Sequence, residues 1–432
     1  MIKFFRKIYF ELITSKYVKH LFVLTSGVGF SQLIPLLLLP VLTRFFSPTD
    51  FGVLAIFMAI IQLIAISTTL RLEMAIVLPK KDTDAALVCI VAFFFLATFC
   101  LLLFGIASLL WLFVVKSNDF LIFEQYHDNL YLSFYYLIPM GAFLLGLYNI
   151  LYHWNNRMEL YANMSYSHIT HSVFSTPLSI LFYFSSLNNI GLILGQIIGR
   201  FLACFLLLKN LFQTIKLIPK DTIVINIFTL LKEYKKFIVF ETPHSILNFI
   251  SQKYIIGVFS AFFGVFTVGI FDLADKIIGK PLGIISNSFK TVFYKRLTTA
   301  KDKLTIFKKS IMLMTFISFI LTVPFYIIPE SFFVLLLGDE WIDTGKYIQL
   351  LCPLLFSRFI FNVVTPTISY TMQNHYLLIW QIIYFICLVF LFHSLKESVV
   401  EHVILIYAIF GACMYAMLGF ISFKVLKHSI KI

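Results

Sequence analysis

The feature that most constrains the fold of this chain is a series of apolar runs of about 20 residues, separated by short polar breaks. A helix of this length crosses the hydrocarbon core of a bilayer with every backbone hydrogen bond made inside the segment. With 60% hydrophobic residues and a mean hydropathy of +0.93, the chain is predicted to be an all-α integral membrane protein. We predict twelve crossings, at residues 20–43, 51–70, 86–115, 130–152, 166–185, 189–208, 237–259, 262–286, 310–328, 346–370, 376–394 and 402–424.

The basic residues are unevenly divided between the two sides of this arrangement. With the N-terminus placed in the cytoplasm, 25 of the 34 Lys and Arg residues fall in cytoplasmic segments, and the opposite side has only Arg44, Lys116, Lys346 and Lys396. This is the positive-inside pattern, which predicts that both termini are cytoplasmic. The apolar run after the basic N-terminus is long and no small-residue cleavage site follows it, so the first helix is expected to remain uncleaved. The net charge of +13 therefore reflects topology and attraction to anionic lipid, and a nucleic-acid partner is not expected.

A polar interruption at 209–236 divides the predicted helices into two sets of six. We therefore predict an N-terminal six-helix lobe at 1–215 and a C-terminal six-helix lobe at 216–432, which enter the membrane in the same direction. The inner part of the interruption predicts an amphipathic helix on the membrane surface. The segments FFSPTDFGV at 45–53 and FFGVFTVGI at 262–270 form a short internal repeat at matching positions of the two lobes: each begins with Phe-Phe and has a glycine seven residues after the first Phe. Parallel repeats of this kind are typical of transporters.

Ionisable side chains inside the predicted helices, leaving His, Tyr and Cys aside, are the second informative feature. Near a helix centre each costs about 2.5–3.5 kcal/mol to insert, so together they would cost on the order of 20 kcal/mol if they faced lipid. They must therefore face one another or a water-filled cavity. Five are basic and three are acidic, which predicts a cavity of net positive charge. The eight residues are Arg200, Glu241, Lys253, Asp272, Asp275, Lys276, Lys280 and Arg358.

The stretch FDLADKIIGKP at 271–281 carries four of these charges. Asp272, Lys276 and Lys280 are successive i,i+4 neighbours, so this helix is expected to have one charged face. Counting a rise of about 1.5 Å per residue from the helix ends places Arg200, Lys276 and Arg358 near the middle of the bilayer on three different helices.

Two interpretations of these charges are open from the sequence. Asp272 and Lys276 can neutralise one another on one helix, and such internal pairs would only lock helices together. Lys253, Arg200 and Arg358 have no obvious local partner, and cations in this setting favour an anionic substrate.

Residues that would indicate a metal or a catalytic centre are sparse. All six cysteines fall inside predicted helices without a C-x-x-C pair, so neither a disulfide framework nor a zinc site is expected. His168 and His171 lie three residues apart, but no carboxylate or cysteine completes a ligand set with them and His153. The chain also lacks a Walker loop and a nucleophile elbow. We therefore predict a protein without a metal or organic cofactor.

Three segments resemble a known family: VLTRFFSPTDFGVLAIF at 41–57, LRLEMAIVLPKKDTDAA at 70–86, and VGIFDLADKIIGKPLGIISNSFKTVFYKRL at 268–297. They resemble polysaccharide biosynthesis proteins of the Wzx O-antigen flippase type, which belong to the same superfamily as the MATE exporters. The resemblance implies two six-helix lobes that move an undecaprenyl-diphosphate-linked oligosaccharide from the cytoplasmic to the outer leaflet of a bacterial inner membrane. It also implies a carrier coupled to a H⁺ or Na⁺ gradient, with the polymerase and chain-length proteins of the same pathway as partners.

On this basis we expect the cations to bind the diphosphate and the acidic residues to take up ions or to tune the lysines. The expected substrate-binding residues are Arg44, Arg200, Lys253, Lys276, Lys280 and Arg358. The expected ion-coupling or pairing residues are Glu241, Asp272 and Asp275.

Two alternatives belong to other functional classes. A drug exporter of the same superfamily would share the fold, but its cavity should attract cations. An O-antigen polymerase or ligase would be an enzyme with a large outer loop, whereas the outer loops predicted here are short, the longest being at 116–129 and 329–345.

Overall fold

The computed structural model describes residues 16–116, 136–185, 190–215, 232–299, 302–371, 373 and 375–431. Within these residues the regular secondary structure is helical throughout, which confirms the all-α prediction. The extreme N-terminus, the predicted outer loop after residue 116 and nearly all of the predicted amphipathic helix lie outside the described residues.

Packing divides the chain into two compact units. Unit 1 comprises Met1–Leu38 and Ile56–Ile250, and unit 2 comprises Leu39–Ala55 and Ser251–Ile432. The helices α4 (Pro48–Thr68) and α12 (Lys235–Thr299) contribute residues to both units. The two lobes predicted at 1–215 and 216–432 stay a prediction.

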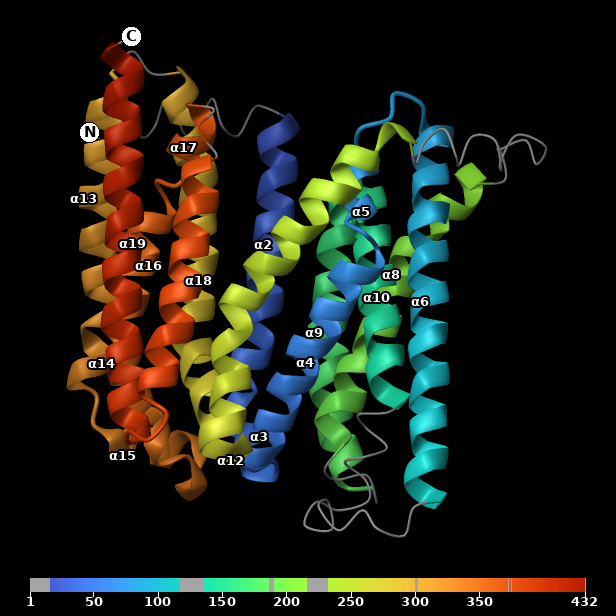
Figure 1. Ribbon diagram of the computed structural model, residues 1–432, viewed down its shortest axis with the longest axis horizontal. Helices are drawn as coiled ribbons and strands as arrows, with labels where there is room; N and C mark the ends of the chain where they lie inside the picture. Colours follow the sequence, from blue (N-terminus) through green and yellow to red (C-terminus); the bar gives the residue numbers. More distant parts are fainter. Residues whose placement is uncertain are drawn as a thin grey trace. The chain divides into compact units, whose positions relative to one another are not determined.

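Unit 1 is organised around α9, which packs against α2 and α10, while α8 packs against α6 and α10 (Figure 1). Small residues allow close contacts between these helices: a Cβ added at Gly195 of α10 would overlap the Ser175 carbonyl oxygen and Ser179 Oγ on α9. The remaining helices of the unit are α2 (Lys16–Leu37), α5 (Leu72–Ala75), α6 (Asp82–Lys116), α8 (Ile138–Arg157), α9 (Tyr161–Tyr183) and α10 (Gly191–Ile215).

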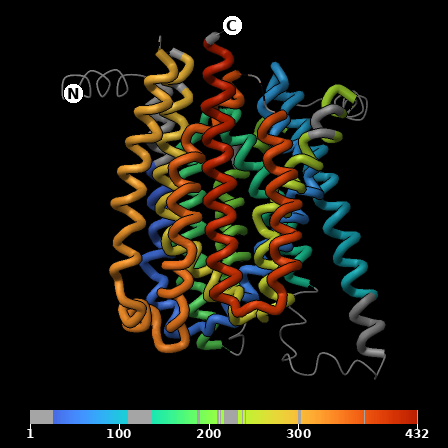
Figure 2. Tube along the Cα trace, turned by 60° about the vertical axis from the view of Figure 1, so that its left-hand side comes forward, coloured from blue at the N-terminus to red at the C-terminus, as the bar shows by residue number. Residues whose placement is uncertain are grey.

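In unit 2, α16 packs against α13 and α19, and α18 packs against α19, so that these helices stand side by side (Figure 1 and Figure 2). The elements of this unit are α3 (Leu39–Phe45), α13 (Lys303–Thr322), α14 (Pro324–Ile327), α15 (Glu330–Leu337), η4 (Asp339–Trp341), α16 (Asp343–Asn362), α17 (Pro366–Tyr370), α18 (His375–Ser394) and α19 (Val400–Lys431).

The long helix α12 is two arms joined at Gly264, whose φ of 83° and ψ of 166° lie outside the helical region. The rings of Phe259 and Phe271, one on each arm, have centroids 4.8 Å apart. In a continuous helix twelve residues would span about 18 Å, so the second arm must fold back beside the first.

Nine helical segments in the described part of the chain are long and apolar enough to cross a membrane. The longest of these, Glu241–Thr298, contains both arms of α12. The more polar helices α8 and α9 contain 20 and 23 residues, which is also sufficient to span a bilayer. Counted with these two helices and with the arms of α12 taken separately, the described helices match the twelve predicted crossings.

The two segments of the short internal repeat, 45–53 and 262–270, contact each other within unit 2. A Cβ added at Gly52 would overlap the carbonyl oxygen of Val265, and one added at Gly269 would overlap that of Pro48. The glycines shared by the two segments therefore let the start of α4 cross the second arm of α12 at backbone distance.

Candidate functional site

The second arm of α12 carries the charged stretch predicted from the sequence. Asp272 and Lys276, one turn apart, form an ion pair along this helix. Asp272 is buried, whereas Lys280 is exposed at the next turn. The ion pair that the spacing allows is therefore present, and the roles of Asp272 and Lys276 stay a prediction.

Asp275 forms an ion pair with a residue of another helix. Arg358 of α16 donates from Nη2 to Asp275 Oδ1 at 3.1 Å. Gly279 lies one turn beyond Asp275, and a Cβ added there would be 3.0 Å from Arg358 Nη2 and 3.3 Å from Asp275 Oδ1. Glycine at this position thus leaves the space that the guanidinium group occupies.

A cavity of about 380 Å³ lies beside this ion pair within unit 2. Its walls come from both arms of α12 and from α16, α18 and α19. Lys253 and Arg358 contribute two positive charges to the lining, and Asp275 contributes one negative charge. Small-ligand sites have volumes of roughly 300–1,000 Å³, so the cavity is large enough for a ligand group. Its charge balance favours an anionic group over a cation.

One side of the cavity is aromatic. The ring of Tyr384 stacks on those of Trp380 and Phe410, with centroid distances of 5.4 and 5.6 Å. Such tyrosines offer a ligand both an apolar ring face and a hydroxyl group, which are the two kinds of surface that a sugar ring presents. The tyrosines that line the cavity are Tyr384, Tyr407 and Tyr415.

Uncharged polar side chains complete the lining. Ser286 is buried, and its Oγ has no hydrogen-bond partner among the described residues. Asn362 accepts a hydrogen bond at Oδ1 from Lys290 Nζ at 3.3 Å. A buried hydroxyl without a partner costs about 1–3 kcal/mol, so Ser286 would gain from a hydrogen bond to a bound ligand.

Arg44 belongs to unit 2 but is not part of the cavity lining. Its Nη2 donates to the carbonyl oxygen of Leu335 at 2.8 Å and so joins α3 to the C-terminal turn of α15. A cation is stabilised at a helix C-terminus by the partial negative charge of the last carbonyl groups. The contact gives Arg44 a structural role, and its role toward a substrate stays a prediction.

Arg200 lies in unit 1, where its guanidinium carbon is 4.6 Å from the centre of the Tyr148 ring. The Tyr148 hydroxyl is 3.1 Å from Ser167 Oγ, and the Tyr148 ring is 5.9 Å from that of His168. Arg200 forms no ion pair with a carboxylate of the described residues. It is therefore held by an aromatic ring instead of a counter-ion.

Glu241, also in unit 1, lies on the first arm of α12 and contacts Ser245 at 3.4 Å. The structure thus places Lys253, Asp275 and Arg358 around one cavity, with Asp272, Lys276 and Lys280 on the same helix as Asp275, and it places Arg200 and Glu241 in the other unit.

Several groups of this site were not found from the sequence. The tyrosines are three among 21 in the chain, and Gly279 is one among 18 glycines, so neither type stood out. The signal that could have pointed to Gly279 is its position on the charged face, four residues after Asp275.

The family model described as "Polysaccharide biosynthesis protein" matches residues 41–346, which is more than half of the chain. The chain belongs to this family. The comparison with curated proteins gave no match.

Solved structures identify the fold of this polysaccharide biosynthesis protein. An inward-facing multidrug resistance MATE family transporter of the MOP superfamily matches with a TM-score of 0.64 and 14% identity, over 94% of this chain and 93% of the other. A MOP superfamily transporter from Pyrococcus furiosus, whose binding pocket is described as having reverse polarity, matches with a TM-score of 0.58 and 12% identity, over 96% and 98%. At these identities the likeness shows a MATE-like fold, and function has to be argued from the site.

Proposed function

We propose that this polysaccharide biosynthesis protein is a flippase that moves undecaprenyl-diphosphate-linked oligosaccharide units from the cytoplasmic to the periplasmic leaflet. The bacterial inner membrane is its location, with both termini in the cytoplasm. The observation that carries the proposal is the cavity of unit 2, which combines two cations with three tyrosines. The family supports a glycan substrate, and the fold supports transport.

The diphosphate is the group that Lys253 and Arg358 bind in this proposal. A guanidinium group has five N–H donors, so Arg358 can donate to a phosphate while Nη2 remains bonded to Asp275. Asp275 competes with the phosphate for that charge and keeps binding weak enough for release. Tyr384, Tyr407 and Tyr415 pack on the sugar next to the diphosphate.

The other predicted residues act along the path of the head group. Lys276, Lys280, Arg200 and Arg44 attract the anion, while Asp272, Asp275 and Glu241 take up H⁺ or Na⁺ from the coupling gradient. Pro281 of α12 and Pro353 of α16 each remove a helix hydrogen bond near the cavity, which favours bending during alternating access. The polymerase and chain-length proteins of the pathway would receive the translocated unit.

Deletion of the gene tests the function as a whole. Loss of surface polysaccharide together with complete single units trapped in the cytoplasmic leaflet is the expected result. Units that reach the outer leaflet but are not polymerised would point to a polymerase or ligase instead. An intact glycan coat with new drug sensitivity would point instead to a MATE-like exporter.

A point variant tests the cavity. Lys253→Ala removes one of its two cations and should lower transport at least about tenfold, the factor that corresponds to roughly 1.4 kcal/mol. Lys396→Ala is the matched control, because Lys396 is exposed and is not part of the cavity lining. Normal transport by Lys253→Ala at wild-type protein level would remove Lys253 from the substrate site.

A further inference from the structure

The turn between α4 and α5 has a strained backbone and a buried carboxylate. Leu70 and Arg71 adopt φ values of 51° and 54°, in the left-handed region that non-glycine residues rarely occupy. Two residues later, at the second position of α5, Glu73 is 1% exposed. The turn lies between the membrane-spanning segments Pro48–Thr68 and Asp82–Leu109.

Glu73 has one partnered and one unpartnered oxygen. Its Oε1 accepts from Arg71 Nη1 at 3.2 Å, whereas Oε2 is buried and has no hydrogen-bond partner among the described residues. The neighbouring Thr69 hydroxyl donates to the Ala65 carbonyl oxygen at 3.0 Å, so its hydrogen is directed elsewhere. Burying an ionised carboxylate oxygen without a hydrogen-bond donor costs free energy, and this cost falls when the carboxylate is protonated and becomes neutral.

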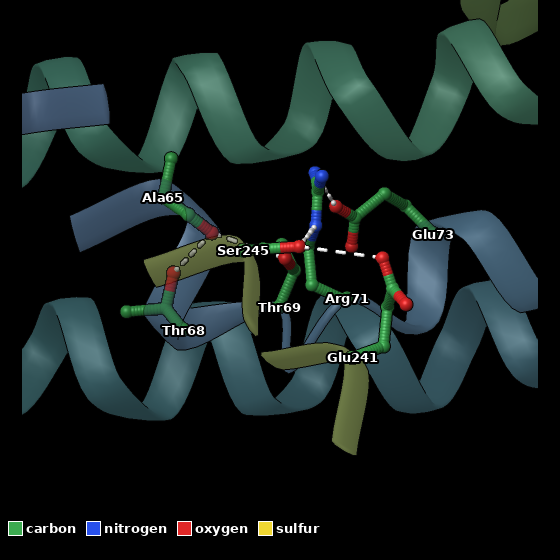
Figure 3. Close-up of polar contacts among 7 residues, drawn as sticks. All are labelled: Ala65, Thr68, Thr69, Arg71, Glu73, Glu241 and Ser245. Carbon is green, nitrogen blue, oxygen red and sulfur yellow. Dashed lines mark hydrogen bonds and ion pairs between the residues drawn. The ribbon is translucent and has the colours of Figure 1, made fainter. Parts of the chain in front are cut away.

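Arg71 also connects this turn to α12, as Figure 3 shows. Its Nε donates to Ser245 Oγ at 2.8 Å, and the Ser245 hydroxyl lies 3.4 Å from Glu241 Oε1, to which it can donate. One guanidinium group is thus placed between two carboxyl groups: Glu73 on α5, by direct contact, and Glu241 on α12, through Ser245. All of these residues belong to unit 1.

The other charged and titratable groups near this turn come from α6 and α8, which pack against α5. Asp82 of α6 accepts from Arg157 of α8, and Arg157 also donates to the carbonyl oxygens of Ile76, Val77 and Pro79. Asp84 lies on α6, and His153 lies on α8. Among the described residues, Arg71 is the cation that contacts Glu73.

We propose that Glu73 is a proton-binding site of this protein and that its protonation transfers Arg71 from Glu73 to Glu241. The proton binds at Oε2, and the carboxylate becomes a neutral acid. The ion pair at Oε1 then weakens, and the positive charge of Arg71 is balanced by Glu241 on the first arm of α12. The proton thus sets how tightly the α4–α5 turn is tied to α12, whatever substrate the protein carries.

The sign of the pH dependence follows from burial, which is the largest effect and raises the pKa of the Glu73 carboxyl above its ordinary value of 4.5. The neighbouring Thr69 hydroxyl, the charge of Arg71 and the backbone amide of Glu73 oppose this rise in pKa without cancelling it. A carboxyl group whose pKa is higher in the folded than in the unfolded protein stabilises the folded state at pH values below its unfolded-state pKa. This stabilisation is lost as the pH rises through the folded-state pKa. Glu73→Gln removes this titration.

The experiment is the apparent Tm of the purified full-length protein in detergent between about pH 5 and pH 8. The Tm of Glu73→Gln minus that of the wild type should rise with pH, because the wild type alone loses the contribution. Glu159→Gln, a change at an exposed carboxylate of the same unit, should give a constant difference. A constant difference for Glu73→Gln would overturn the proposal.

A double-mutant cycle tests the exchange of partners. Glu241→Gln should lower the Tm more in the Glu73→Gln background than in the wild type at pH 8, because Arg71 then depends on Glu241. Equal effects in the two backgrounds would contradict the exchange.

If Glu73→Gln does not fold, the infrared carbonyl band of a protonated carboxyl can be measured in the wild type and in Glu73→Asp. The proposal requires a band that titrates above 4.5 and moves in the aspartate variant. A band that is absent or unmoved would overturn it. None of these readouts depends on flippase activity, so their failure would leave the proposed function untouched.

Discussion

Arg358 of α16 and Asp275 of α12 are joined at 3.1 Å on the wall of the cavity in unit 2. The two side chains are 33% and 39% exposed, so the pair can be reached by water or by a ligand. The hydrogen bond to Asp275 uses one donor of the guanidinium group and fixes its position. The pair therefore orients a cation toward the cavity without occupying all of its donors.

The Asp275→Asn variant tests whether this carboxylate weakens substrate binding. With the negative charge removed, the lining of the cavity retains two cations and no carboxylate among the described residues. An anionic diphosphate probe should then bind several-fold more tightly, while turnover falls because release becomes slower. Equilibrium binding of the probe and the rate of flipping in vesicles measure the two effects. Asp339→Asn, at an exposed position outside the cavity lining, is the control, and unchanged probe affinity in Asp275→Asn would contradict the role given to Asp275.

The Gly279→Ala variant tests the space beside the ion pair. The added methyl group would be 3.0 Å from Arg358 Nη2, so the guanidinium group has to give way by a few tenths of an ångström. If its present position binds the substrate, transport should fall several-fold. Gly283 lines the same cavity, and a Cβ added there meets nothing within 4 Å. Transport by Gly283→Ala should therefore stay close to that of the wild type. Equal activity of the two variants would mean that the position of Arg358 is not critical.

The crossing of α4 and α12 should be intolerant of side chains. Gly269→Ala places a methyl group on the Pro48 carbonyl oxygen, and because backbone cannot rotate away we expect a loss of roughly 1–3 kcal/mol or more. Gly257→Ala, in the first arm of α12 with nothing within 4 Å, should instead stabilise the helix by up to ~1 kcal/mol. The apparent Tm and the yield of folded protein in detergent distinguish the two variants. A Gly269→Ala protein as stable as the wild type would contradict the close crossing.

The start of α13 should lose stability in acid. Asp302 accepts at Oδ1 from the Thr305 amide at 3.0 Å, and the hydrogen bonds from Thr305 lower the pKa of this carboxyl below 3.8. The stabilisation by the ionised Asp302 cap is therefore fully present above pH 3.8, the ordinary pKa of the carboxyl group. It is lost as the pH falls through the lower pKa that Asp302 has in the folded protein. The Tm difference between the wild type and Asp302→Ala should shrink in this range.

Asp302→Ser serves as the control for that titration, because serine caps a helix without carrying a charge. Its Tm relative to Asp302→Ala should not change with pH. If the Tm of Asp302→Ser relative to Asp302→Ala fell in acid as much as that of the wild type does, groups other than Asp302 would be responsible for the loss of stability.

The sequence alone determined the features that depend on neighbours along the chain. The helices were predicted because an apolar run of bilayer length is a one-dimensional signal. The pairing of Asp272 with Lys276 follows from i,i+4 spacing on one helix. The likeness of 45–53 to 262–270 was also found from the sequence, whereas the contact between these two segments at their shared glycines was not predicted.

Only the tertiary structure decided which side chains from different helices meet. It paired Arg358 with Asp275, selected three of the 21 tyrosines for one cavity, and placed Arg71 between Glu73 and Ser245. These contacts depend on how far each helix is rotated and where it crosses its neighbours, which is set by the packing of whole surfaces. Spacing along one helix contains no information about that rotation, and for this reason the charges were predicted from the sequence but most of their partners were not.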